Sequence, residues 1–482
     1  MIGCCLWMAG DVRSAGEEAG PANILFINAD DLGWADAGFM GSAFYETPNL
    51  DRLASEGMVF SNAYAPAANC APSRASVYTG WHIPRHRIFT VMRSDRGRPE
   101  HRRLIPTENT PYLPLGTPTM AAMLQEAGYV TAHFGKWHVS DDPLDFGYEV
   151  NLGGGPNGHP PAGYFAPYGM PSLPDGPEGE YLTDRLGSEV IRFLEERDPE
   201  RPFFVSLQLY SPHTPLQAKE ERVAYFEART PSALHDHAVY AAMVSHLDEN
   251  VGRILDVLDE LGLSASTLVL FTSDNGGIHE ISRQAPLRGE KGSYYEGGIR
   301  VPMVVRWPER VEPGSRSDVP VIGTDFLPTF LEAGGVDAPE DHPLDGISLV
   351  PLFKGAGGPP PERALFWHFP VYLQPFRQGN AESRDPLFRT RPGSAIRQGR
   401  WKLIEYFEDG ALELYDLEHD PGERRNLARL MPGKAEELHA TLAAWREETG
   451  APVPEEANPL FDAEAEEQAL LRLHGGPGSE SP

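Results

Sequence analysis

The stretch NILFINADD, residues 23–31, joins a short apolar run to two consecutive carboxylates. Runs of this length, bounded by turn residues, are typical of strands buried in a parallel sheet. Four further runs of the same kind follow along the chain: YVTAHF (129–134), PFFVSLQLY (202–210), TLVLFT (267–272) and VPMVVRW (301–307). The sequence therefore predicts a sheet built from these five segments.

Three longer segments lie between these runs, at residues 117–127, 181–197 and 237–261. Their apolar residues recur at three- and four-residue spacing, which is typical of amphipathic helices. Gly128 and Gly262 follow two of them, at the position where helices commonly end on a glycine. Alternating strands and helices predict an α/β fold with a large mixed, mostly parallel sheet and helices on both faces.

The pattern changes after about Gly358, so we expect a first domain over residues 22–358 and a C-terminal subdomain over 359–450. Strand-like pieces at 394–396 and 401–406, then an amphipathic segment at 434–449, predict a small antiparallel sheet with a helix.

The two ends of the chain carry weaker signals. The acidic tail, residues 451–482, contains Pro and Gly, and we expect it to be poorly ordered. Residues 1–21 begin with the short apolar run MIGCCLWMAG, which has no basic leader. The remnant of a secretory signal and a disordered leader are equally favoured readings of this start.

Composition excludes several classes of protein. Among 482 residues, 70 are acidic and 41 basic, which gives a net charge of -29. Such a surface repels nucleic acid and anionic membranes, so an anionic substrate would need a locally basic site. No later stretch approaches the roughly 18 apolar residues of a membrane span. Outside Cys4 and Cys5 the only cysteine is Cys70, which excludes a disulfide within the body of the chain.

Two stretches depart from the alternating pattern. Residues 85–103 hold seven arginines and two histidines, a basic cluster that fits either a solvated loop or a surface that steers an anionic substrate. Residues 153–179 are crowded with Gly and Pro and predict an irregular surface excursion.

Polar residues follow the predicted strands at their carboxyl ends, where open α/β sheets bind ligands. Asp30 and Asp31 follow the first strand, and Asp274 and Asn275 follow the fourth. Each pair alone is an ordinary turn or helix-cap sequence. At one shared edge, however, they form an all-oxygen set that suits Ca²⁺ or Mg²⁺ better than zinc.

Cationic residues follow two other strands and a glycine-rich loop. Lys136 and His138 come after the second strand, His213 after the third, and Lys291 lies in LRGEKGSYYEGG. A lone histidine is more often structural and a lone lysine more often solvated. Beside acidic metal ligands, these residues could stabilise charge and transfer protons near neutral pH.

The segment Asn69 to Arg74 places Cys70 at the start of a predicted helix and close to Arg74. A cysteine in such a position has a depressed pKa, which indicates a reactive thiol, whereas the alternative is an inert buried cysteine. From these rules alone, a thiol nucleophile with His138 or His213 as its base remains open.

The sequence resembles the type I sulfatases, which belong to the alkaline phosphatase superfamily. The motifs that carry the resemblance occur in the expected order: NADDLGW, CAPSR with ASVYTG, GKWH, SPHTP, SDNGG and LRGEKGSYYEGGIRVP. The resemblance covers roughly residues 23–449. One departure is visible, because Val139 and Ser140 follow GKWH where relatives commonly have Leu-Gly, and we expect no catalytic consequence.

The resemblance implies an alkaline phosphatase-like fold with a small C-terminal subdomain, and a periplasmic or secreted bacterial enzyme. It also implies that a separate maturation enzyme oxidises Cys70 to formylglycine. The Ca²⁺ ligands would be the formylglycine and four side chains, with Mg²⁺ less favoured: Asp30, Asp31, Asp274 and Asn275.

The resemblance further implies the course of the reaction. Arg74 and Lys136 would hold the hydrated aldehyde, one hydroxyl of which, activated by the metal and Asp274, would attack sulfur. His213 or Lys291 would assist departure of the alcohol. His138 would then take the proton of the second hydroxyl, so that sulfate leaves and the aldehyde is restored.

Other functions remain open on the sequence. Phosphonate and phosphate monoester hydrolases share the fold and sometimes the CxPSR signature, and a degenerate scaffold could bind sulfated glycan without turnover. For the substrate we expect a sulfated carbohydrate, because of the basic cluster and because Trp81 and Tyr164 could flank a sugar ring. An enzyme acting on aryl sulfates is the alternative.

Overall fold

The computed structural model describes residues 20–308, 310–353, 362–377 and 382–475. The start of the chain, with Cys4 and Cys5 and almost all of the predicted leader, lies outside the described residues, as does the predicted boundary at 358/359. No helix within the described ranges is long and apolar enough to cross a membrane.

The main sheet has eight strands in the order β10-β2-β9-β7-β1-β6-β4-β5. Its parallel centre consists of β7, β1, β6 and β4, while β9 runs antiparallel to β7. The strands are β1 Asn23–Ala29, β2 Met58–Phe60, β4 Val130–Gly135, β5 Val150–Leu152, β6 Phe203–Gln208, β7 Thr267–Ser273, β9 Met303–Arg306 and β10 Ser315–Ser317. The predicted mixed, mostly parallel sheet is confirmed, and all five predicted runs contain a strand of it.

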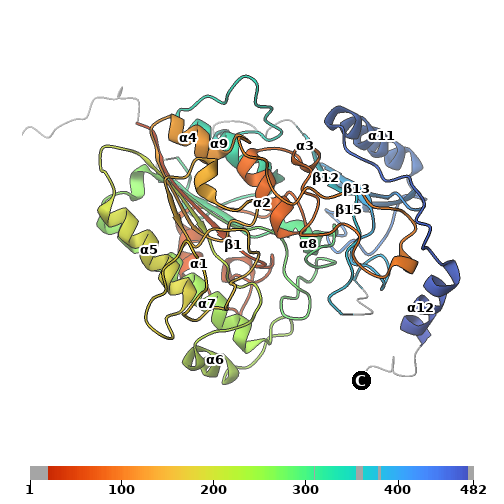
Figure 1. Ribbon diagram of the computed structural model, residues 1–482, viewed down its shortest axis with the longest axis horizontal. Coiled ribbons are helices and arrows are strands. Elements are labelled where there is room, and N and C mark those ends of the chain that lie inside the picture. The colour runs from red at the N-terminus through yellow and green to blue at the C-terminus, as the bar shows by residue number, and fades with distance from the viewer. Residues whose placement is uncertain (1–19, 309, 354–361, 378–381, 476–482) are drawn as a thin grey trace, which may run out of the picture.

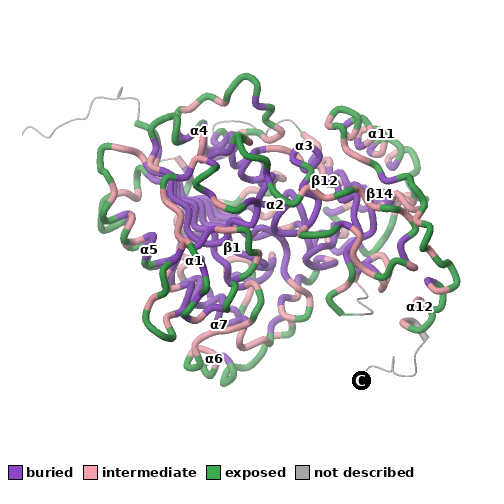
Figure 2. Tube along the Cα trace, in the orientation of Figure 1, coloured by how far each residue is buried: buried purple, intermediate pink, exposed green. Residues whose placement is uncertain are grey.

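Helices cover both faces of this sheet (Figure 1). One face is packed by α1 Pro48–Glu56, α5 Leu182–Glu196 and α7 Ala238–Glu260, and the other by α2 Cys70–Thr79, α4 Met120–Glu126 and α9 Phe326–Gly334. Along β1, Leu25 and Ile27 join the first core, whereas Ile24 and Phe26 join the second. The strand is apolar on both sides because each face is buried, as Figure 2 shows for the sheet.

The predicted helix ends are confirmed at two glycines. Gly128 has φ +95° beyond α4, and Gly262 has φ +69° beyond α7. Both are left-handed conformations, which glycine adopts without a Cβ clash.

Short elements connect these layers. A second sheet has the order β11-β3-β8, from β3 Ala63–Tyr64, β8 Arg300–Val301 and β11 Val321–Ile322. The remaining short helices are α3 Ile83–His86, α6 Glu220–Glu227, α8 Glu296–Ile299 and α10 Val350–Phe353.

The C-terminal part contains a four-stranded antiparallel sheet in sequence order. Its strands are β12 Ala364–Phe369, β13 Gly393–Gln398, β14 Trp401–Tyr406 and β15 Ala411–Asp416, and α11 Pro432–Thr449 packs on them. Trp445 of α11 stacks on Phe366 of β12 with ring centroids 4.7 Å apart, which fixes the helix on the sheet.

The expectation of a poorly ordered tail is wrong for part of it. Residues Ala463–Gly475 form helix α12, which lies beside residues 99–101 of the basic cluster. Glu466, buried in this helix, pairs with Arg103 at 2.7 Å and with Arg391 at 3.0 Å. The acidic composition that indicated disorder is here neutralised by two arginines.

Residues 153–179 form no helix and only an isolated bridge, and many of them are exposed, as predicted, but buried side chains anchor the segment to the core. Tyr164, Tyr168 and Leu173 are buried and belong to the core on the α5 and α7 side of the sheet. The Gly and Pro content predicted the irregular backbone. It did not predict which residues are buried, because that depends on the apolar side chains between the Gly and Pro residues.

Candidate active site

The carboxyl ends of the central strands bring the predicted site residues together. Backbone hydrogen bonds join the segments beyond the strands, from Asp30 N to Ser211 O and from Asp274 N to Ala29 O. Lys136 N likewise donates to Gln208 O at the end of β6. The order β7-β1-β6-β4 therefore delivers four loops to one edge of the sheet.

Each of the three carboxylates at this edge lies against a cation. Lys136 Nζ is 2.6 Å from Asp30 Oδ2, and Lys291 Nζ is 2.6 Å from Asp31 Oδ1. Arg74 Nε donates to Asp274 Oδ2 at 2.9 Å. The Lys136, Asp30, Arg74 and Asp274 side chains are wholly buried, so these charges are held in a water-poor environment.

The backbone at Asp31 is strained into position. Its φ is +66°, a left-handed conformation that a non-glycine residue seldom adopts. Its carboxylate accepts a hydrogen bond from Asn275 Nδ2 at 2.7 Å, and its own N–H donates to Asp274 Oδ1 at 3.2 Å. Lys291 and His213 hold the pKa of Asp31 below its ordinary value although burial acts in the opposite direction.

The oxygen atoms of this cluster fit a bound cation. Asp30 Oδ1 and Asn275 Oδ1 are buried and have no hydrogen-bond partner, although buried oxygens are nearly always paired. Ligand atoms of Asp30, Asp31, Cys70 and His213 lie within 4.8 Å of one another. Unpaired carboxylate and amide oxygens are hard donors that suit Ca²⁺ or Mg²⁺.

Asp274 is not one of those four residues, but it belongs to the same cluster. Its carboxylate accepts hydrogen bonds from Asp31 N and Arg74 Nε. Burial and the charge of Asp30 raise the pKa of Asp274 above its ordinary value, in spite of Arg74. A divalent cation would offset this crowding of carboxylates.

Cys70 is the first residue of α2, as the sequence predicted, and is 3% exposed. Burial acts to raise the pKa of its thiol, but the charges of Lys136 and Lys291 hold that pKa well below the ordinary value. The position therefore favours negative charge at the end of this side chain, and the cations around it are set before any ligand binds.

The two histidines next to Cys70 have pKa values shifted in opposite directions. His138, also at φ +66°, is 8% exposed, and burial lowers its pKa to about 4. His213 has Nε2 3.6 Å from Asp31 Oδ2; burial opposes protonation, yet the carboxylates of Asp30 and Asp31 raise its pKa overall. His138 is therefore neutral at pH 7, and His213 holds its proton more readily than a free histidine.

Gln208 is part of this arrangement and was missed in the sequence. It ends β6, and its Oε1 accepts hydrogen bonds at 2.9 Å from both Arg74 Nη1 and Asn28 Nδ2. It thereby orients Arg74 toward Asp274. The signal was a polar residue at the carboxyl end of an apolar strand, which a search for ionisable groups passes over.

Two aromatic residues expected to flank a sugar ring do not lie where that role requires. Tyr164 is fully buried, and its hydroxyl donates to the main-chain oxygens of Tyr210 and His213. Trp81 follows the C-terminal end of α2, opposite Cys70, and stacks on His342. The Tyr164 hydroxyl is used inside the protein and Trp81 lies at the far end of α2 from Cys70, so neither residue is placed to flank a sugar at Cys70.

The basic cluster at 85–103 is mostly neutralised within the protein. Arg85 pairs with Asp345, while the other ion pairs are Arg93 and Arg102 with Asp95, Arg98 with Glu100, and Arg103 with Glu466. These five arginines are tied to carboxylates, which favours the structural interpretation of the cluster for them. Arg87 and Arg96 form no ion pair with a carboxylate of the described residues, and the Nε of Arg96 is buried without a hydrogen-bond partner.

Comparison with known proteins agrees with this geometry. The family model "Sulfatase" matches residues 22–336, and the model "N-sulphoglucosamine sulphohydrolase, C-terminal" matches residues 290–448. A sulfatase of Formosa agariphila is 30% identical, over 89% of this chain and 89% of its own length. Mouse steryl-sulfatase is also 30% identical, over 98% of this chain and 89% of its own.

Among solved structures, Ps i-CgsB in complex with k-i-k-neocarrahexaose superimposes with a TM-score of 0.72 and 28% identity. The match covers 95% of this chain and 98% of that one. The family resemblance, the fold with its antiparallel C-terminal sheet and the enzyme class inferred from the sequence are thus confirmed. The chain belongs to the sulfatase family of hydrolases, with the alkaline phosphatase-like fold of that family.

Proposed function

We propose that this sulfatase removes sulfate from a sulfated carbohydrate with a nucleophile made by oxidation of Cys70 to formylglycine, beside a bound Ca²⁺. The observation that carries the proposal is a buried ring of cations around Cys70 next to two buried oxygens that lack partners. A sulfate ester is anionic and repels nucleophiles, so cations placed in advance lower the barrier to attack.

Asp30, Asp31, Asp274 and Asn275, with the oxidised residue 70, would hold the Ca²⁺. The ion supplies positive charge to the sulfate oxygens and to the nucleophile. The left-handed backbone at Asp31 supports this assignment, since strain of this kind is retained where a functional position requires it. Mg²⁺ is the less favoured ion.

The oxidised side chain, as its hydrate, offers two hydroxyl groups. One would serve to attack sulfur, with its proton passing to Asp274 while the bond from sulfur to the alcohol oxygen breaks. The other would lose its proton to His138, so that the bond from carbon to the sulfated oxygen breaks, sulfate leaves and the aldehyde is restored. Arg74 and Lys136 orient these hydroxyls. Their side chains are fully buried and fixed by Asp274 and Asp30, so they need no rearrangement during the reaction.

Protons move through the two histidines. His213, whose pKa is raised, suits donation of a proton to the departing alcohol, with Lys291 as the alternative donor. Asp31 holds the pKa of Lys291 above its ordinary value, so this ammonium serves better as a fixed charge. His138, neutral at pH 7, accepts the proton of the second hydroxyl.

A carbohydrate substrate and an exported enzyme are the finer parts of the proposal. Similarity to a structure that contains a carrageenan-type hexasaccharide supports the carbohydrate, whereas similarity to a steryl-sulfatase shows that the family accepts other alcohols. Export to the periplasm or medium would bring the enzyme to sulfated polysaccharide. Recovery of active protein only from the cytoplasm of its native host would contradict export.

The proposal is tested on protein coexpressed with a formylglycine-generating enzyme. Mass spectrometry of the peptide containing Cys70 should show conversion of thiol to aldehyde. The converted protein should release inorganic sulfate from members of a panel of sulfated mono- and oligosaccharides. Release of phosphate from phosphate or phosphonate esters with no sulfate release from any ester would replace this function by the alternative one.

A further inference from the structure

Arg96 differs from the paired arginines of the basic cluster. No carboxylate of the described residues forms an ion pair with it, and its Nε is buried without a hydrogen-bond partner. Its Nη2 lies 3.4 Å from Thr90 Oγ1, which in turn accepts a hydrogen bond from Asn69 Nδ2 at 3.1 Å. Asn69 immediately precedes Cys70, so this chain of contacts leads from Arg96 to the nucleophile.

Arg389 approaches the same place from the C-terminal part of the chain. It is 7% exposed, donates from Nη1 to the main-chain oxygen of Lys291 at 3.0 Å, and has a buried Nε with no partner. Its guanidinium carbon lies 3.6 Å from the centroid of the Phe376 ring. Within the described ranges Arg389 also forms no ion pair.

The segments that carry the two arginines pack against each other, because the ring of Phe388, next to Arg389, lies against Gly97, next to Arg96. Burial and the charge of Arg96 lower the pKa of Arg389 to about 10, while Glu290, Asp31 and Cys70 act in the opposite direction. Burial also lowers the pKa of Arg96, and Cys70 opposes it. Arg389 is buried and Arg96 is half-buried, and neither forms an ion pair with a carboxylate of the described residues. Holding two such cations together is costly, and an anionic ligand would offset that cost.

We propose that Arg96 and Arg389 form a second anion-binding subsite beside the sulfate site, and that the natural substrate carries a second anionic group next to its sulfate ester. This inference rests on the proposed function. The second group is a sulfate or a carboxylate, because the guanidinium fork binds either in the same way.

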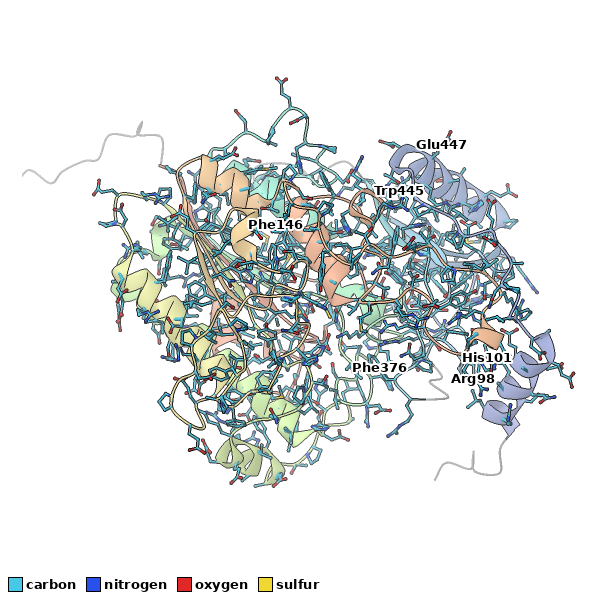
Figure 3. All side chains as sticks on the ribbon, in the orientation of Figure 1. Arg98, His101, Phe146, Phe376, Trp445 and Glu447 are labelled. Atoms are coloured by element: carbon cyan, nitrogen blue, oxygen red, sulfur yellow. The ribbon has the colours of Figure 1, made fainter. Side chains whose placement is uncertain are left out.

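Space for further sugar units adjoins the pair. Gly97, next to Arg96, and Phe376, whose ring covers Arg389, both line a cavity of about 410 Å³. Arg98, His101 and Arg472 line it as well, and Figure 3 labels Arg98, His101 and Phe376. The cavity offers both cationic and apolar groups, as a polyanionic sugar chain requires.

The test measures kcat/KM of matured Arg96→Gln and Arg389→Gln on four sulfate esters. These are an uncharged aryl alcohol sulfate, a neutral sugar monosulfate, a disulfated disaccharide and a monosulfated disaccharide with a uronic acid. Each variant should lose about 30-fold or more on one of the two doubly anionic esters and less than about 3-fold on the singly anionic ones. The ester that suffers identifies the second group as sulfate or carboxylate.

Arg93→Gln is the matched control, because Arg93 is an exposed arginine of the same cluster that pairs with Asp95. It should leave all four rates within about 3-fold of the wild type. Arg389→Lys keeps the charge without the fork and should recover part of the loss. Arg96 is only partly buried, so Arg96→Gln tests the subsite even if replacement of Arg389 prevents folding.

Equal losses on all four esters, or no loss on any, would overturn the subsite. A wild-type enzyme that turns over the singly anionic esters as well as the doubly anionic ones would also overturn it, while the proposed function stands. Absence of sulfate release from every ester by the matured wild type would instead defeat both.

Discussion

Two buried clusters of charge lie at different places in this molecule, and they differ in how completely they are paired. One cluster lies where the three-stranded sheet meets the C-terminal sheet. There Lys402 Nζ is 2.9 Å from both Glu296 Oε1 and Glu423 Oε1, and all three side chains are fully buried. Tyr64 donates to Glu296 Oε2 at 2.6 Å, and Glu296 N donates to Glu423 Oε2 at 2.6 Å. Here three of the four carboxylate oxygens accept a hydrogen bond, and the fourth, Glu423 Oε1, accepts none but lies against the Lys402 ammonium.

The active-site edge holds three carboxylates and three cations, and it leaves three polar atoms without partners: Asp30 Oδ1, Asn275 Oδ1 and Arg74 Nη2. Burial and charge density are therefore shared features, and incomplete pairing is the feature that separates a binding site from a structural joint. Buried polar groups that a fold leaves unsatisfied are costly, so they persist where a ligand completes them.

The largest expected effect is at the nucleophile. Cys70→Ala should lower sulfate release by about 10⁴-fold or more, since no side chain remains to attack sulfur. Thermal unfolding should stay within a few degrees of the wild type, because a buried methyl still fills the start of α2. Ala71→Gly, at the next position of that helix, is a control that should retain activity in the folded fraction. Substantial turnover by Cys70→Ala would contradict the assignment.

Removal of one unpaired oxygen should have the next largest effect. Asn275→Ala should lower sulfate release by about 10²- to 10³-fold and abolish most of the rise in melting temperature that Ca²⁺ gives the wild type. Asn426→Ala is a suitable control, because that amide makes three hydrogen bonds to the main chain but lies in the C-terminal part. An unchanged response of Asn275→Ala to Ca²⁺ and to chelator would remove Asn275 from the metal site.

The structural joint should respond in the opposite way. Lys402→Met leaves Glu296 and Glu423 buried without their cation and should lower the free energy of unfolding by about 3–5 kcal/mol. Its kcat per folded molecule should remain within about 3-fold of the wild type. Denaturant unfolding with parallel active-site titration measures both, and a selective loss of kcat would show that the joint takes part in the chemistry.

The same contrast explains how far the sequence could be read. Asp30, Asp274 and His213 were predictable because each follows a buried strand, and strand ends of an α/β sheet converge. Gln208 also ends a buried strand, but its amide does not ionise and was passed over. Arg389 lies in no pattern that marks chemistry. The contact of Arg389 with Lys291 O joins residues 98 apart, from different parts of the fold.

Errors of the sequence reading share one cause. Helix α12 and the buried residues at 153–179 were misread because composition reports local preference, while their burial depends on distant partners. For Tyr164 the residue type suggested a sugar contact, but its hydroxyl is used inside the protein. In each case the position of the residue depends on partners that are distant in the sequence and meet it only in the folded protein.

The smallest predicted effect concerns a buried group that is neutral instead of charged. His368 in β12 lies between Ser394 Oγ at 2.8 Å and Pro452 O at 2.9 Å, and burial lowers its pKa to about 3. The carbonyl accepts only, so Nε2 carries the proton and Nδ1 accepts from the serine.

In the unfolded chain His368 takes up a second ring proton near pH 6.5, whereas in the folded protein it does so only near pH 3. The neutral, buried His368 therefore contributes fully to the free energy of unfolding above pH 6.5. This contribution is lost as the pH falls toward 3, by about 1.4 kcal/mol per pH unit. His368→Gln keeps both hydrogen bonds and cannot titrate, so its free energy of unfolding should fall less steeply between pH 6 and 5 by that amount. Denaturant melts at the two pH values measure the slopes. Equal slopes in the two proteins would mean that His368 is charged in the folded state, in spite of its burial and its two hydrogen bonds.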